Sequence, residues 1–546
     1  MPARAEGQAA TGSRLPAPSE VRLPALGEAA SDDFNLSQEK RIGEQIMREI
    51  RRDPDYLDDP QLLDYLQSLW QPLVQAARQR GDIDADTERL FPYEAFLVRD
   101  RSVNAFALPG GFVGVHLGLM ALTATPDELA SVLAHELSHI TRRHIARSVT
   151  ANSRSSTLGL AAMLLGLLVA SRASNPDAAQ AAVVGGQAAM AQAQLNFSRD
   201  MEREADRSGL ALMGLAGFAP AGMASMFDKL DQSSRLNDSG GFPYLRSHPL
   251  TIDRIGEARQ IVQATGGAAA PPPAPLLHLL MQARARVLMD PSAQAWQRLQ
   301  ALDARATMTE LAPAERVVGL YTSALASARL RDFARAERAS SAAQALLAAV
   351  PGPAEPLARR ALANQLAQGA LARGDVAGAR RALAEGAGAA VGTGAGAGAG
   401  AGTGVASASG LDPSRAGLLL RADLALAEGG DAALRPSAEA LQTWVAEHRA
   451  DASAWQLLAQ TTDRQGLKLR SLRAEAEAQA ALGNLPGAID RLRAGQQLAR
   501  KGGVVTDFIE ASVIDARLRD LLAQRRELLV DQRKQRGGPR DEPQEP

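Results

Sequence analysis

Two histidines four residues apart, with a glutamate directly after the first, are the residues of this sequence best suited to metal chemistry. They are His135, Glu136 and His139, in the segment HELSH. On a helix this spacing places both imidazoles on one face, where they can reach one tetrahedral Zn²⁺. Zinc lowers the pKa of a bound water, and Glu136 can take the proton as that water attacks a carbonyl carbon. The pattern predicts a hydrolase with one Zn²⁺ per chain; the alternative is two solvated histidines on a helix.

A catalytic zinc needs a third protein ligand and one open position. The metzincin pattern would require a glycine and a histidine where this chain has Arg142 and Ile145, so that class is excluded. His144 lies nine residues after His135, on the opposite face of a continuous helix, and is expected to be exposed or structural. The third ligand must therefore come from elsewhere in the chain.

The segment RDMEREADRSG, residues 199–209, is the best source of this ligand. Glu202 and Asp206 share one helix face at i,i+4, whereas Glu204 points away. We predict Glu202 as the third ligand and Asp206 as a carboxylate that orients a ligand or the fold. The alternative is a merely solvated, charged helix face.

The residues around HELSH predict how the motif is positioned. Thr125, Pro126 and Glu128 are typical of a capping box, so a helix should begin there and carry the motif. Upstream, residues 94–99 and 104–117 have strand character, and the second segment is broken by Pro-Gly-Gly. A short sheet or hairpin is therefore expected beside the motif helix.

Composition narrows the remaining possibilities. The 546 residues carry a net charge of −1, which gives no field that would favour nucleic acid, and there is no cysteine for disulfides or thiolate zinc sites. The apolar stretch within residues 155–171 is too short to span a bilayer. We expect a buried helix there, or alternatively a hairpin with peripheral membrane contact. The first residues show no signal peptide, although Ala3-Arg4-Ala5 resembles the remnant of a cleavage site.

The C-terminal half of the sequence is rich in Ala, Leu and Arg and alternates apolar helical segments with short turns. The turns at Arg373-Gly374-Asp375 and Leu482-Gly483-Asn484 are typical of tetratricopeptide-type helix pairs, although the period is irregular. Stacked helix pairs commonly form a curved surface that binds protein or peptide.

The predicted fold class is mainly α: a zincin-type α+β metallopeptidase domain with a small sheet, followed by an α-helical, tetratricopeptide-like repeat domain. The predicted boundaries are a flexible leader at 1–33, the peptidase domain at 34–268, a Pro-rich linker at 269–275, the repeat domain at 276–505 with a Gly/Ala-rich insertion at 386–410, and a terminal helix and disordered tail at 506–546.

HELSH and the later FSRDMEREAD resemble the zinc peptidase family that includes HtpX and the CAAX prenyl endopeptidases, whose marks are HExxH and a later ExxxD. NAFALPGG, residues 104–111, is similar to the strand and turn before the catalytic helix of that family. SHPLTIDRI, residues 247–255, is similar to its later His-Pro motif and supplies His248 and Arg254. The chain most resembles the periplasmic branch with C-terminal tetratricopeptide repeats, the β-barrel assembly-enhancing proteases, although the insertion at 386–410 is not expected there.

This resemblance implies a periplasmic protease that degrades misfolded or stalled outer-membrane proteins, with a repeat domain that contacts the β-barrel assembly machinery and a possible chaperone-like role. It also implies that extended substrate pairs with a strand edge, here the segment beginning with Asn104, Ala105 and Phe106. The alternatives are an assembly factor that acts only through its repeats, and a small-molecule hydrolase, which such a large partner domain disfavours.

His248 allows three interpretations. Its ring can cap the following helix, or it can donate to the developing oxyanion with the help of Arg254. The resemblance implies a third: His248 occupies the open position of the zinc and keeps the enzyme latent.

Overall fold

The protein is described from a computed structural model, which covers residues 35–151, 199–236, 243–264, 274–307, 310–350, 355–388, 412–501 and 507–536. Several predicted segments lie outside the described residues: the leader, the apolar stretch at 155–171, nearly all of the linker and of the insertion, and the end of the tail.

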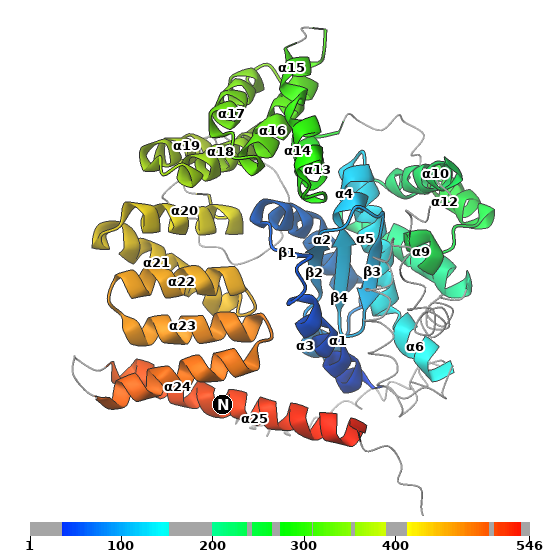
Figure 1. Ribbon diagram of the computed structural model, residues 1–546. Coiled ribbons are helices and arrows are strands. Elements are labelled where there is room, and N and C mark those ends of the chain that lie inside the picture. Colours follow the sequence, from blue (N-terminus) through cyan, green and yellow to red (C-terminus); the bar gives the residue numbers. More distant parts are fainter. Residues whose placement is uncertain are drawn as a thin grey trace, which may run out of the picture.

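One small mixed sheet lies among the helices of the N-terminal half, and a helical region follows, which confirms the predicted mainly α fold class (Figure 1). The sheet order is β1-β2-β4-β3, with β2 parallel to β4 and the outer pairs antiparallel. The predicted strands and the break between them are confirmed, whereas the two-residue strand β1 was not predicted. The strands are β1 (Tyr56–Leu57), β2 (Glu94–Val98), β3 (Ala105–Leu108) and β4 (Phe112–His116).

The helices of the N-terminal half pack around this sheet. Most of their buried faces join one side of β2 and β4 in a large apolar core that includes Trp70, Leu97 and Leu133, whereas the first helix packs with Phe96 and Phe112 in a second cluster. The helices are α1 (Leu36–Ile50), α2 (Pro60–Arg80), α3 (Ala85–Leu90), α4 (Leu117–Leu122), α5 (Pro126–Thr141), α6 (His144–Ala151), α9 (Arg199–Leu215), α10 (Ala221–Leu236), α11 (Pro243–Ser247) and α12 (Ile252–Ala264).

Helix α5 begins as its sequence predicts, but its capping differs in one bond. The Thr125 hydroxyl accepts the backbone N–H of Glu128, which satisfies one of the free donors at the helix start. The Glu128 carboxylate accepts the N–H of Ala124, not that of Thr125, and it also pairs with Lys229 of α10. The reciprocal half of the predicted capping box is therefore displaced by one residue, and Glu128 also ties α5 to α10.

Helix α9 lies against α5 at very short range. Gly209 makes this approach possible, because a Cβ there would lie only 3.2 Å from the backbone nitrogen of His135. The contact places the N-terminal part of α9, with Glu202, beside the face of α5 that carries His135 and His139.

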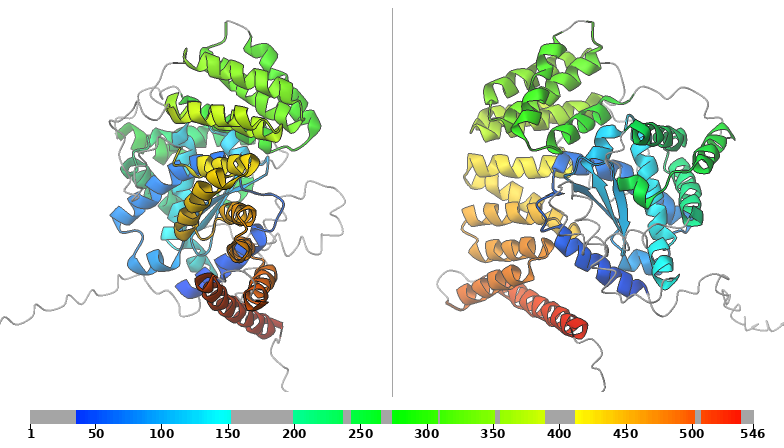
Figure 2. Two further views of the ribbon diagram at one scale, coloured as in Figure 1. Left: turned by 90° about the vertical axis from the view of Figure 1, so that its left-hand side faces the viewer. Right: turned by 45° about the vertical axis from the view of Figure 1, so that its right-hand side comes forward.

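The C-terminal half consists of helices in which neighbours in sequence pack on one another, such as α16 on α17 and α22 on α23. Together they curve along one side of the N-terminal half (Figure 2). They are α13 (Leu276–Leu288), α14 (Ala293–Gln300), α15 (Leu302–Ala306), α16 (Pro313–Arg329), α17 (Phe333–Leu347), α18 (Glu355–Ala372), α19 (Val376–Gly388), α20 (Arg415–Glu428), α21 (Asp431–Glu447), α22 (Ala452–Arg464), α23 (Lys468–Ala481), α24 (Leu485–Lys501) and α25 (Phe508–Arg536).

Helix α2 joins the two halves. Its N-cap residue Asp59 forms a buried, bidentate ion pair with Arg284 of α13, at 2.7 Å for each N–O contact. Tyr65 of α2 contacts the ring of His278, also on α13. Helix α13 shares the apolar core of the N-terminal half, whereas α20–α25 contribute to further clusters, one of which α20 shares with α18 and α19. Among the described residues, no helix combines the length and apolar character needed to cross a membrane.

Candidate metal centre

Four side chains from three segments converge in the interior. His135 and His139 of α5, Glu202 of α9 and His248, directly after α11, each offer one ligand atom, and these atoms all lie within 4.8 Å of one another. The Nε2 atoms of His135 and His139 are 3.0 Å apart, and Nδ1 of His248 lies 3.3 Å from Nε2 of His135. The structure thus brings together the three predicted ligands and the predicted fourth residue.

Asp206 and Arg254 lie directly behind these ligands. Oδ1 of Asp206 is 2.9 Å from Nδ1 of His135, the ring nitrogen that faces away from the cluster. The Arg254 guanidinium pairs with Asp206 at 2.6 Å and 2.8 Å and with Glu202 at 2.8 Å, and it also donates to the carbonyl of Pro249. Because these partners hold Arg254 in the interior, its position favours a role in orienting the two carboxylates. The predicted role, in which Arg254 helps His248 to stabilise an oxyanion, is less favoured.

The charges of the cluster shift its pKa values in opposite directions. Burial lowers the pKa of His135, but its contacts with Asp206 and Glu202 outweigh burial and raise the pKa to about 10. Burial, together with repulsion from His135, holds the pKa of His139 well below its usual range. Burial opposes ionisation of Glu202, yet His248 and His135 bring its pKa far below the usual range. The shifts show that Glu202 is ionised and electrostatically coupled to the histidines around it.

Glu136 is completely buried beside the cluster, and neither of its carboxylate oxygens accepts a hydrogen bond from the described residues. The Nε2 atom of His248 lies 3.5 Å from Oε1 of Glu136. A buried carboxylate without such a bond is costly and is rarely retained without a function. The position fits a base that acts on a small molecule held at the cluster.

His248 is held from behind by Tyr244 of α11. The two rings stack with centroids 4.7 Å apart, and the N–H of His248 donates to the carbonyl of Tyr244. The N–H of Tyr244 in turn donates to the carbonyl of Val103, just before β3. Sequence reasoning missed Tyr244, although an aromatic residue four positions before His248 was a usable signal.

His144 is buried and hydrogen-bonded, so of the two predicted forms, exposed or structural, the structure agrees with the structural one. The expectation of one continuous helix through His144 is wrong, because α5 ends at Thr141 and Arg143 adopts a left-handed backbone with φ of 52°. The chain then restarts as α6, and the buried His144 ring lies with Nδ1 2.9 Å from Nδ1 of His139. Burial lowers its pKa to about 4. Glu204, which does point away from the cluster, contacts the other ring nitrogen of His144 at 3.2 Å.

The predicted substrate strand lies at an edge of the sheet. β3 pairs with β4 on one side, with Ala105 opposite Val115, and no described strand pairs with its other side. Asn104 and Ala105 are buried, and Phe106 lies across Gly114 of β4. β3 packs against α5, so this edge runs beside the helix that carries the cluster.

The donor set suits a divalent metal ion. Imidazole nitrogen and carboxylate oxygen are the ligands that catalytic zinc takes from proteins lacking cysteine, and outer carboxylates such as Asp206 usually orient the ligating histidine. The unbonded Glu136 oxygens are the second observation that fits a metal site, since a metal-dependent hydrolase needs a base beside its metal.

Comparison with known proteins agrees with this geometry. Residues 64–262 match the family model described as peptidase family M48. These residues are an M48 peptidase domain. The match contains every residue of the cluster, and the domain is a metallopeptidase domain.

The M48 domain accounts for the similarity to individual proteins. A Vibrio cholerae protein is 38% identical over 240 residues, which are 44% of this chain and 47% of that protein. The beta-barrel assembly-enhancing protease of Escherichia coli K12 is 33% identical over 243 residues, which are again 44% of this chain and 47% of that protein. Metalloprotease LoiP of E. coli is 29% identical over 174 residues, which are 32% of this chain and 64% of LoiP. The aligned part therefore spans about half the length of the assembly-enhancing proteases.

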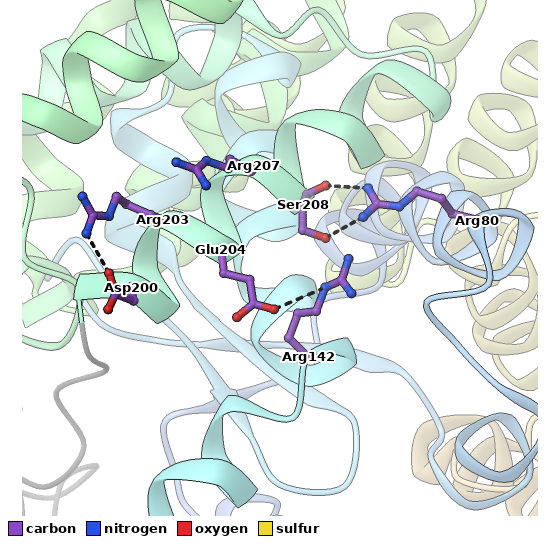
Figure 3. Close-up of a pocket in the computed structure, with 7 residues that line it drawn as sticks. All are labelled: Arg80, Arg142, Asp200, Arg203, Glu204, Arg207 and Ser208. Carbon is purple, nitrogen blue, oxygen red and sulfur yellow. Dashed lines mark hydrogen bonds and ion pairs between the residues drawn. The ribbon is translucent and has the colours of Figure 1, made fainter. Parts of the chain in front are cut away.

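A charged hollow of about 570 Å³ lies on the outer side of α9 of the M48 domain (Figure 3). None of the four converging side chains lines it, so it is separate from the metal cluster. Glu204 is the lining residue that contacts His144. The lining residues are Arg80, Arg142, Asp200, Arg203, Glu204, Arg207 and Ser208.

Proposed function

We propose that this protein is a zinc-dependent endopeptidase with one Zn²⁺ per chain, held by His135, His139 and Glu202. The observation that carries the proposal is the convergence of these ligand atoms beside Glu136, a buried carboxylate without a hydrogen bond from the described residues. When bound, zinc would polarise the scissile carbonyl and lower the pKa of water.

The residues of the chain would divide the remaining work. Glu136 accepts the proton of the attacking water and passes it to the leaving amine. Asp206 fixes the ring of His135, and Arg254 pairs with both Asp206 and Glu202, which helps the two buried carboxylates stay ionised side by side. Burial of the whole cluster strengthens each of these electrostatic contacts.

An extended chain that adds to the β3 edge is the proposed substrate form. Strand addition uses main-chain hydrogen bonds, so it selects unfolded or unpaired segments over a particular side-chain sequence. Asn104, Ala105 and Phe106 lie at the start of this edge, close to α5. Misfolded or stalled outer-membrane β-strands, met in the periplasm, are the proposed class of client, and relatives named beta-barrel assembly-enhancing proteases support a link to β-barrel assembly.

His248 would restrain the enzyme. Its Nδ1 faces the ligand atoms of His135 and Glu202, which supports the latent form, in which the ring holds the fourth metal position, over an oxyanion donor. A substrate or partner would then have to displace His248 before cleavage.

The helices after Leu276 would serve as a tetratricopeptide-like domain for protein partners, with the β-barrel assembly machinery as the proposed partner. The positive φ of Gly374 and of Gly483 at the predicted turns, and the packing of neighbouring helices, support this assignment. The competing function is an assembly factor that binds through these helices without cleaving. The intact cluster favours the peptidase.

Degradation of unfolded clients tests the proposal. The zinc-loaded protein should cleave an unfolded outer-membrane β-barrel precursor, and a chelator should stop cleavage. The matched control is a protein of similar length whose native fold is helical. It is also supplied unfolded, and it should be cleaved more slowly. Precursor that stays intact with zinc-loaded wild type and with the His248→Ala variant would favour the non-proteolytic assembly factor.

A further inference from the structure

The ring of His139 is held on the side that faces away from the ligand cluster. Its Nε2 points to His135 and Glu202, whereas its Nδ1 lies 2.9 Å from Nδ1 of His144. His144 has no exposed surface, and its Nε2 lies 3.2 Å from Oε2 of Glu204. Two imidazoles and a carboxylate thus form a continuous line that starts at a proposed metal ligand.

The chemistry of these atoms fixes the direction of the hydrogen bonds. A carboxylate only accepts, so Nε2 of His144 must carry the proton that faces Glu204. A neutral His144 then has a bare Nδ1, which accepts from the Nδ1–H of His139. That tautomer of His139 leaves its Nε2 free of a proton, which a metal ligand requires. The opposite arrangement would place a proton on the ligating nitrogen.

Glu204 is itself anchored at the surface end of this line. Nη1 of Arg147 lies 2.9 Å from its Oε2, and Nε of Arg142 lies 3.9 Å from its Oε1. Figure 3 shows Glu204 pointing toward Arg142 in the charged hollow. The side chain of Glu204 remains 39% exposed, so the line runs from the buried cluster to a surface accessible to water.

We propose that His144 is a positioning residue for the metal ligand His139, and that Glu204 fixes the tautomer of His144. The left-handed turn at Arg143 serves this role, because it returns the chain so that His144 faces His139. Outer partners of ligating histidines typically contribute roughly 10–100-fold to metal affinity. The inference rests on the proposed metal site.

The test uses the full chain and compares two substitutions of His144. His144→Leu removes the acceptor, and zinc affinity, measured by competition with a chelator, should fall roughly 10–100-fold. The visible absorption of the Co²⁺-loaded protein should change as well, because the His139 ring is no longer oriented. His144→Asn places an amide oxygen near the former Nδ1 and should restore most of the affinity.

His278→Leu is the matched control, since His278 is also a buried, hydrogen-bonded histidine but lies at the α2–α13 contact. It should lower stability without changing zinc affinity or the cobalt spectrum. If His144→Leu cannot be folded, Glu204→Leu should show a smaller loss in the same direction.

Wild-type affinity and spectrum in the His144→Leu variant would overturn the positioning role while leaving the metal site intact. Equal losses in His144→Leu and His144→Asn would also overturn it, because a hydrogen-bond acceptor would then be irrelevant. Failure of the wild type to bind any zinc would instead overturn the proposed function, and this inference with it.

Discussion

One imidazole, that of His248, spans the carboxylates of Glu136 and Glu202: its Nε2 lies 3.5 Å from Oε1 of Glu136, and its Nδ1 lies 3.1 Å from Oε1 of Glu202. The ring therefore occupies the space between the proposed base and a proposed ligand. A substrate carbonyl approaching the metal would need the same space. This relationship makes the role of His248 measurable.

His248→Ala should raise basal proteolysis of an unfolded client, because removal of the ring frees the fourth metal position. Zinc content should remain that of the wild type, since three ligands persist. His448→Ala, at an exposed histidine stacked on Trp444, is the control and should leave cleavage unchanged. A roughly hundredfold fall in cleavage at full zinc content would identify His248 as an oxyanion donor instead.

Glu202→Gln and Glu204→Gln should separate the two glutamates of α9. Loss of the Glu202 carboxylate should weaken zinc binding by more than the roughly 10–100-fold typical of an outer-shell partner. Glu204→Gln should lower zinc affinity a few-fold at most, because the amide oxygen of the glutamine still accepts the hydrogen bond from His144. Isothermal titration with zinc gives both values, and the reverse order of effects would reject the assignment of Glu202 as ligand.

The buried pair of Asp59 and Arg284 should couple the helical region to α2, most of which lies within the M48 domain. Arg284→Met strands a buried carboxylate and should lower the free energy of unfolding by about 3–5 kcal/mol, measured by urea denaturation. Adding Asp59→Asn should recover much of this loss, since asparagine still caps α2 but carries no charge. Arg335→Met is the control. It breaks a part-exposed ion pair with Asp303 and should lower the free energy of unfolding by about 1 kcal/mol or less. Additive losses in the double variant would contradict the coupling.

Glu39 should make stability fall as the pH rises. Burial raises its pKa from 4.5 to about 7, despite the nearby Arg143, so the folded state binds more protons than the unfolded state between these values. Glu39→Gln mimics the protonated form and should be more stable than the wild type above pH 7. This advantage should shrink as the pH falls through 7 and vanish below 4.5. Thermal unfolding of both proteins at a series of pH values measures this difference in stability. A difference that does not change with pH would refute a buried, neutral Glu39.

Local spacing was sufficient to predict the parts of the site that lie within one helix. The separation of His135 from His139, and of Glu202 from Asp206, determines which side chains share a face. His144 could not be placed in this way, because its position depends on a left-handed turn at Arg143 that a helical pattern does not reveal.

Contacts between distant segments were likewise invisible in the sequence. Arg284 lies in a helical segment where an arginine normally faces solvent, and its burial depends on Asp59, 225 residues earlier. Strand β1 has only two residues, too few for an alternating pattern. The fold class followed from composition and motifs, whereas the packing of α13 into the core of the M48 domain required the structure.

The central claim is that Glu136 is the base of a zinc peptidase and not a ligand of its metal. The most direct measurement is zinc stoichiometry together with cleavage of an unfolded client. It compares two proteins that both carry His248→Ala to remove latency, one with Glu136 intact and one with Glu136→Gln. We predict one zinc per chain in both, with cleavage reduced roughly 10²–10⁴-fold by Glu136→Gln. A folded Glu136→Gln protein that binds no zinc, or one that cleaves at the wild-type rate, would contradict the account.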